Sequence, residues 1–306
     1  MPKTLAVVFV LAGVLLSADP QTPAPAASAN LWIDTVALDG SNSPITDLKP
    51  SEFEVWISGF RIPITDVVAV TPESGESRTM VVILDDGAVP QTLAPRVKEA
   101  ARLLVEKLAP GDRMSILPLN GRPTESTDDR SQLLRAIDGY SVRGFPFRID
   151  VAGEHVLRVV TAVARGFAET SSRRKTIVAI GAGWIFDTPL PPPNVNDLGR
   201  EWVEAMRALA TSHTTLYVID PAGVGGAPGR YFGGESGFAR ETGGFAFMNT
   251  NDVRGAVDRI WRESGSYYLL GVTNPPMQRT ADLRQVEVKI LRKGVTARTR
   301  RGITGR

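Results

Sequence analysis

The sequence predicts a doubly wound, Rossmann-like α/β domain inserted in a small β-sandwich. Between residues 76 and 265, apolar runs of strand length alternate with amphipathic stretches of helix length, the pattern of a mostly parallel sheet with helices on both faces. The segments before and after contain only short strands. Two or three strands make a poor core alone, so we expect the two segments to pair. The predicted units are residues 1–29, 30–75, 76–265 and 266–306.

The N-terminus has the pattern of a secretory signal. A basic start at Lys3 is followed by an apolar run from Leu5 to Leu16, which is too short for a bilayer of ~30 Å. Small residues allow cleavage after Ala18 or Ala29, and residues 19–29 are a Pro- and Ala-rich linker. The alternative is an uncleaved anchor. We expect a periplasmic or extracellular protein without a stable membrane span after cleavage.

The flanking segments alternate and turn like short strands. The predicted strands of the N-terminal segment are 31–36, 53–57 and 62–70, and those of the C-terminal segment are 267–272, 286–291 and 295–300.

The central region contains the β–α alternation. Its predicted strands are 80–84, 114–119, 176–180, 215–219 and 244–247. Its predicted helices are 93–108, 131–137, 151–168, 202–210, one around 238–242, and 252–263.

Composition excludes several classes of function. The chain has 306 residues, of which 42% are hydrophobic, enough for a large core. With 35 Lys and Arg against 33 Asp and Glu, the net charge of +2 gives no reason to expect a nucleic-acid partner. The absence of cysteine excludes a thiol enzyme, a thiolate metal site and a lipidated cysteine, and two histidines exclude a His-rich metal cluster.

Several segments together resemble the bacterial VWFA-related group, exported proteins with a von Willebrand factor A (vWA) domain between strand segments. The segments that carry the resemblance are Leu48–Val55, Pro110–Arg113, Ala239–Gly244, Asn249–Asp252, Ser266–Gly271 and Arg298–Gly302. The resemblance extends over nearly all of residues 31–306. It implies a vWA fold with a metal-ion-dependent adhesion site at the carboxyl edge of the sheet, where hard oxygen ligands hold Mg²⁺ for a partner's carboxylate.

This chain departs from that metal site at each motif. The first motif appears as Asp85-Asp86-Gly87-Ala88-Val89, without its two serines. The threonine loop corresponds to Pro146–Asp150, with Arg148 there and no threonine, and the Thr-Asp-Gly of the later loop is Gly181-Ala182-Gly183. The degenerate site positions are Asp85, Gly87, Val89, Arg148 and Gly181. We therefore expect no bound metal and no cofactor.

Other motifs have ordinary explanations. Gly234–Phe238 lacks the last glycine of a nucleophile elbow, and the glycines from Gly223 to Gly237 lack the Gly-Lys-Ser/Thr of a phosphate loop. His155 and His213 are interpreted as packing or surface positions. The basic C-terminal end is interpreted as solvated faces of edge strands, with anionic lipid or polysaccharide contact as the alternative; it comprises Arg292, Lys293, Arg298, Arg300 and Arg301.

Trp184-Ile185-Phe186 follows Gly183 at the sheet edge where vWA domains bind partners. Together with Asp85 and Asp86, these residues form the candidate partner-contact face, although neighbouring segments could equally cover the aromatic pair. We expect a non-enzymatic, adhesion-type protein with a protein partner in the cell envelope. The alternatives are a hydrolase that uses carboxylates such as Asp85, Asp86 and Asp187, and a purely structural envelope component.

The exported protein should begin at Asp19 or Asn30, because both follow small-residue cleavage patterns. N-terminal sequencing of protein recovered outside the cytoplasm measures this. Soluble cytoplasmic protein that retains residues 1–18 would contradict the prediction.

Overall fold

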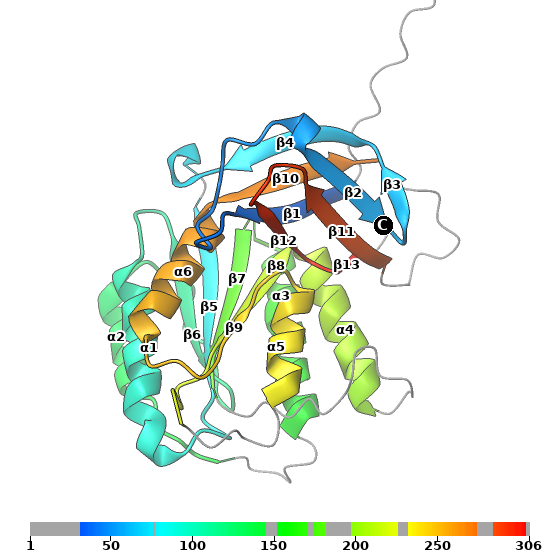
Figure 1. The fold of residues 1–306 in the computed structure, drawn as a ribbon. Helices are drawn as coiled ribbons and strands as arrows, with labels where there is room; N and C mark the ends of the chain where they lie inside the picture. Colours follow the sequence, from blue (N-terminus) through cyan, green and yellow to red (C-terminus); the bar gives the residue numbers. More distant parts are fainter. Residues whose placement is uncertain are drawn as a thin grey trace, which may run out of the picture.

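The computed structural model describes residues 31–75, 77–144, 152–170, 174–181, 197–225, 232–273 and 284–303. It contains one five-stranded parallel sheet with helices on both faces and two four-stranded antiparallel sheets (Figure 1). The predicted mixed α/β, Rossmann-like class is confirmed. The predicted signal and linker, residues 1–29, lie outside the described residues. No helix in the described part is long and apolar enough to cross a bilayer.

The parallel sheet has the strand order β6-β5-β7-β8-β9. Its strands are β5 (Arg78–Leu84), β6 (Arg113–Pro118), β7 (Arg174–Ile180), β8 (Thr214–Ile219) and β9 (Ala246–Phe247). All four pairings are parallel. The central strands are buried on both faces, which explains why their sequences are continuously apolar rather than alternating.

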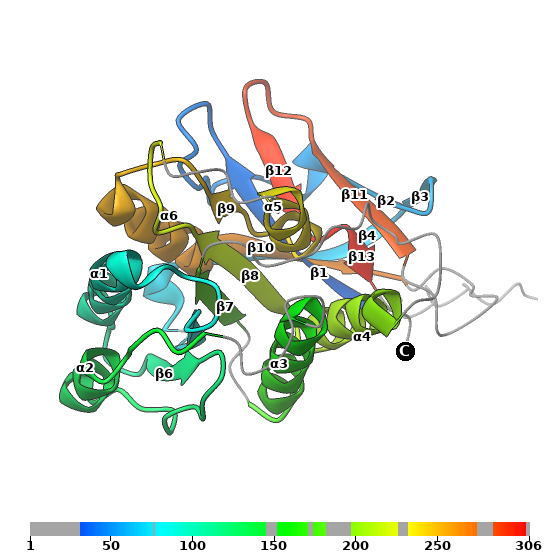
Figure 2. The same cartoon turned by 90° about the horizontal axis from the view of Figure 1, so that it is seen from below.

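Two layers of helices bury the two faces of this sheet (Figure 2). One layer contains α1 (Ala94–Glu106), α2 (Arg130–Asp138) and α6 (Val253–Gly265), and the other contains α3 (Ala152–Ala168), α4 (Asp197–Thr211) and α5 (Phe232–Glu241). Short 3-10 turns are η1 (Pro50–Glu52), η2 (Pro72–Ser74) and η3 (Gln91–Leu93). Each helix has an apolar stripe toward the sheet, as its sequence period predicts.

Strands from the two ends of the chain pair in both antiparallel sheets. One sheet has the order β12-β1-β10-β4 and the other β13-β11-β2-β3. The strands are β1 (Leu31–Leu38), β2 (Phe53–Ile57), β3 (Phe60–Ile62), β4 (Ile64–Val70), β10 (Tyr267–Val272), β11 (Arg284–Ile290), β12 (Thr296–Thr299) and β13 (Gly302–Ile303). Side chains from both sheets share one buried core, so the pair is a sandwich.

Two strands of the sandwich, β3 and β13, were not predicted from the sequence. Ser58 and Gly59 both have positive φ, 50° and 83°, which makes a tight hairpin between β2 and β3. The resulting β3 has three residues, and β13 has two. Segments this short contain too little alternation to be recognised from sequence.

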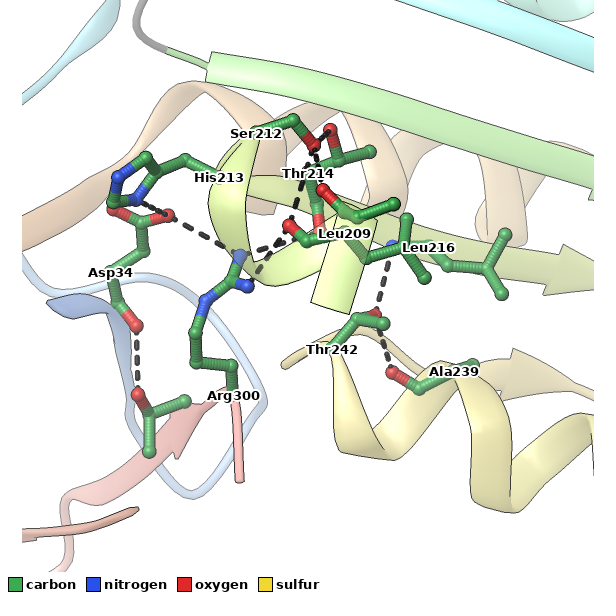
Figure 3. Close-up of polar contacts among 11 residues, drawn as sticks. Asp34, Leu209, Ser212, His213, Thr214, Leu216, Ala239, Thr242 and Arg300 are labelled. Carbon is green, nitrogen blue, oxygen red and sulfur yellow. Dashed lines mark hydrogen bonds and ion pairs between the residues drawn. The ribbon is translucent and has the colours of Figure 1, made fainter. Parts of the chain in front are cut away.

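A buried arginine joins the sandwich to the α/β domain (Figure 3). The Arg300 side chain is 3% exposed and donates to the carbonyls of Leu209, at 3.1 Å, and Thr214, at 3.3 Å. Its guanidinium also lies 3.7 Å from the Asp34 carboxylate of β1. The interpretation of Arg300 as part of a solvated edge is therefore wrong, because α4 and β8 cover it.

Two other arginines of the basic end are also paired. Arg298 lies 2.5 Å from Glu263, a fully buried carboxylate of α6. Arg292 lies 2.8 Å from Glu52 and lowers the pKa of that carboxyl to about 2. These contacts connect the C-terminal strands to other parts of the chain, so neither arginine is merely a solvated edge residue.

Arg300→Ala should lower the free energy of unfolding by about 3–5 kcal/mol, because it leaves a largely buried carboxylate and two carbonyls without their cation. Urea denaturation measures the change. Arg301→Ala is the matched control: that side chain is 52% exposed, so its removal should alter stability by no more than about 0.5 kcal/mol. Equal effects of the two variants would contradict the role assigned to Arg300.

Candidate functional site

The candidate site is the carboxyl edge of the parallel sheet, at the end away from the sandwich (Figure 1). The sandwich contacts the amino edge, since Arg300 reaches the first residue of β8, Thr214. The chain leaves β5 toward α1 on one face and leaves β7 toward α4 on the other. This divergence is a topological switch point, where open α/β sheets bind their ligands.

Asp85, the first residue after β5, is buried and holds the following loop in place by hydrogen bonds. Its side chain is fully buried, and Oδ1 accepts hydrogen bonds from the amides of Gly87, at 2.9 Å, and Ala88, at 2.8 Å. Its own amide donates to the Ile180 carbonyl at the end of β7. The carboxylate therefore fixes the turn that follows β5.

Asp86 is also fully buried, but it connects β5 to two other loops. Its Oδ1 accepts from the backbone amide and the side-chain amide of Asn120, at 2.9 and 3.0 Å. Its Oδ2 lies 3.8 Å from Arg143 Nε, and its carbonyl accepts from the Arg143 and Gly144 amides. Asp86 therefore ties the loop after β5 to Asn120 and to Arg143.

Tyr140, just after α2, is buried beside Asp85 at the carboxyl edge. Its hydroxyl donates to the Asp85 carbonyl at 2.6 Å. Burial raises the pKa of Tyr140, and the nearby charges of Asp85 and Asp86 raise it further. The hydroxyl therefore stays protonated and acts as a donor, which the sequence analysis did not anticipate.

Asp220 follows β8 at the same edge and was not predicted from the sequence. This carboxyl is 2% exposed, and its burial raises its pKa. It accepts from the Ala222 amide at 2.8 Å, while Arg96 donates to the carbonyls of Pro221 and Ala222. An aspartate directly after an apolar strand was the available signal, as it was for Asp85.

Gly223 has the tightest surroundings in this loop. Its φ is +71°, and a Cβ there would lie 2.2 Å from Asn251 Oδ1 and 2.5 Å from Arg96 Nη1. Glycine is needed at this position because the backbone passes directly over the Arg96 side chain.

The donor set at this edge does not fit the Mg²⁺ ion that the sequence resemblance to vWA domains implies. Gly87, Val89 and Gly181 have no side-chain oxygen, and Arg148 lies outside the described residues. Asp85 and Asp86 each use one oxygen for loop amides, and Arg143 places a positive charge beside Asp86. Within the described ranges, no three His, Cys, Asp or Glu side chains are grouped as metal ligands would be.

The predicted contact face is described only in part. Trp184, Ile185 and Phe186 lie outside the described residues, as does Asp187. Asp85 and Asp86 lie beneath the surface and shape it. The exposed side chains that the structure places at this edge include Val224, 61% exposed, and Arg143, 59% exposed.

The remaining candidates lie at different places in the fold. His155, on α3, is at the carboxyl edge, because its Nε2 is 3.1 Å from the carbonyl of Leu119, the residue after β6. His213 precedes β8 at the opposite, amino edge, with Nδ1 3.7 Å from Asp34. Ser236 lies inside α5 and not at a strand-to-helix turn, so the structure does not form a nucleophile elbow there.

No family model matches this chain, and no curated protein matches it. Solved structures similar to it include an aerotolerance-related membrane protein from Bacteroides fragilis NCTC 9343 with multiple mutations to serines. It is 16% identical, with a TM-score of 0.42, over 61% of this chain and 98% of that one. At this level of similarity, the fold assignment rests on the strands and helices of the chain itself.

Two pilus proteins are also similar. The PilB minor pilin from Streptococcus sanguinis is 8% identical, with a TM-score of 0.39, over 61% of each chain. The pilus adhesin RrgA from Streptococcus pneumoniae is 10% identical, with a TM-score of 0.28, over 49% of this chain and 24% of that one. This chain thus spans about three fifths of the pilin and a quarter of the adhesin.

The melting temperature should be the same in EDTA and in excess Mg²⁺, because Gly87, Val89 and Gly181 lack the side-chain oxygens of a vWA site. Millimolar Mg²⁺ on a micromolar site would add ~4 kcal/mol of stability. Differential scanning fluorimetry measures the difference. A rise of several degrees that Asp85→Ala abolishes would show that the edge binds the ion.

Proposed function

We propose that this chain is an exported, non-enzymatic interaction protein with a vWA-type domain whose adhesion site has lost its metal. The carboxyl edge of the parallel sheet contacts a protein partner in the cell envelope. In a metal-bearing vWA domain the ion presents positive charge at this edge. Here the exposed Arg143 guanidinium presents a positive charge beside Asp86, with its Nε 3.8 Å from the carboxylate.

One observation carries the proposal: the switch-point edge is away from the sandwich, and Asp85 and Asp86 are turned inward to order the loop after β5. The sandwich contacts the amino edge through Arg300 and leaves the carboxyl ends of β5, β7 and β8 at the other end. Asp85 and Asp86 fix the loop after β5 and join it to Asn120 and Arg143, so the described part of the edge presents an ordered surface. An ordered surface loses less conformational entropy when it binds.

The same observation argues against the hydrolase alternative. A carboxylate pair for acid–base chemistry needs two groups that face one cleft, one of them with a raised pKa. Asp85 and Asp86 are buried and accept hydrogen bonds from amides of their own loops. Neither carboxylate therefore has the access to substrate that a catalytic acid or base needs.

A photo-crosslinker on a single cysteine at Val224 should give a discrete protein adduct in the envelope fraction, because this position is exposed at the proposed contact edge. The chain has no native cysteine, so labelling is unique. Immunoblotting measures the adduct. Leu291, 57% exposed on the sandwich, is the matched control position.

The proposal predicts an adduct from Val224→Cys that Leu291→Cys does not give. Adding Arg143→Ala to the Val224→Cys chain should reduce the yield. The same adducts from both positions, or none from either, would contradict a partner at the carboxyl edge.

A further inference from the structure

The outer face of the sheet β13-β11-β2-β3 has a tryptophan near its centre. The residues of β2 and β11 alternate between buried and more exposed, and Val55 and Val288 point into the core of the sandwich. Trp56 therefore faces outward. It lies opposite Arg61 of β3 on one side and opposite Glu287 of β11 on the other. A large aromatic side chain is unexpected there, since the outward positions of such a sheet are ordinarily polar.

Two exposed ion pairs surround this tryptophan. Arg61 lies 2.9 Å from Glu54, and Lys289 lies 3.6 Å from Glu287. We call these four residues and Trp56 the Trp56 face. Its two acids and two bases balance, so the face has no net charge. Exposed ion pairs contribute at most ~1 kcal/mol each, so their donors and acceptors can turn to a ligand at little cost.

The indole of Trp56 has an unused hydrogen-bond donor. Its Nε1 is buried and has no hydrogen-bond partner among the described residues. The Lys289 ammonium covers the ring, 5.1 Å from its centre. A cation over an exposed ring contributes only ~0.5–1 kcal/mol, and the lysine stem is flexible, so a ligand can displace this cover. An acceptor on the ligand would then satisfy the indole N–H, whose burial without a partner is costly.

A hollow of about 360 Å³ adjoins the Trp56 face, at the end of β3. Glu54 and Arg61 line it, and its other lining residues are apolar. The volume falls within the ~300–1,000 Å³ of small-molecule pockets. Because the same ion pair borders both the hollow and Trp56, one extended ligand can contact both.

We propose that the Trp56 face binds a neutral polysaccharide. A sugar ring has one apolar C–H face, which stacks on the negative face of an indole ring, and a rim of hydroxyls that both donate and accept. Glu54 and Glu287 accept from such hydroxyls, whereas Arg61 and Lys289 donate to them. A second sugar of the same chain occupies the hollow beside Glu54 and Arg61.

The chemistry of the face favours this class of ligand over others. An anionic lipid or polysaccharide needs a surplus of positive charge, and the charges of the Trp56 face cancel. A protein partner is favoured by a contiguous apolar patch of several hundred Å², whereas a single ring is here enclosed by four charged side chains. The face lies on the sandwich and not at the carboxyl edge, so its test stands or fails independently of the proposed protein contact.

Isothermal titration calorimetry of the mature chain with two neutral probes, chitohexaose and cellohexaose, tests the site. At least one probe should bind, and Trp56→Ala should weaken that binding at least about tenfold, since the stacking and the indole donor are both lost. Phe60→Ala is the matched control. Its ring is 72% exposed but lies opposite the inward-facing Ile57, outside the Trp56 face, so binding should not change. Circular dichroism shows that both variants fold.

Arg61→Ala provides a second variant, because a side chain that is 62% exposed is not needed for folding. It should weaken binding at least about threefold, since it removes donors beside the ring. Heparin is the anionic probe. Binding of heparin and of neither neutral probe, no binding at all, or equal affinities of the parent and Trp56→Ala would overturn the proposal, as would an equal loss in Trp56→Ala and Phe60→Ala.

Discussion

The burial of the Arg300 guanidinium is the interaction on which the arrangement of the two parts depends. Its charge and donors need partners inside the protein, and these come from Asp34 of the sandwich and from the carbonyls of Leu209 and Thr214 in the α/β domain. A buried cation is costly without its partners, so these contacts favour the observed position of the two parts. Gly243 allows this close approach, since a Cβ there would lie 2.9 Å from the Arg300 amide.

This position decides which surfaces remain for function. With the sandwich at the amino edge, the carboxyl ends of β5, β7 and β8 lie at the opposite end of the molecule. The two aspartates after β5 serve the loops themselves: Asp85 accepts from two amides and Asp86 joins Asn120 to Arg143. A vWA site would direct such oxygens outward to an ion. Here inward hydrogen bonds give the edge its order.

The sequence by itself determined the class of the fold, because hydrophobic period depends on local burial. The run Met80-Val81-Val82-Ile83-Leu84 is apolar throughout since β5 has helices on both faces, and this pattern is visible without coordinates. The short strand segments at both ends implied that they pair, since neither can bury a core alone. The departure from the vWA metal motif at Gly87, Val89 and Gly181 was equally visible, because a ligand set is a matter of residue types.

Tertiary structure alone decided the environment of each polar group. Arg300 and Arg301 are adjacent and chemically identical, yet one is 3% and the other 52% exposed, because only Arg300 faces α4 and β8. Tyr140 and Asp220 join the site only because α2 and β8 end beside β5 and β7 in space. Such outcomes depend on contacts between distant segments, and the local sequence contains no record of which segments will meet.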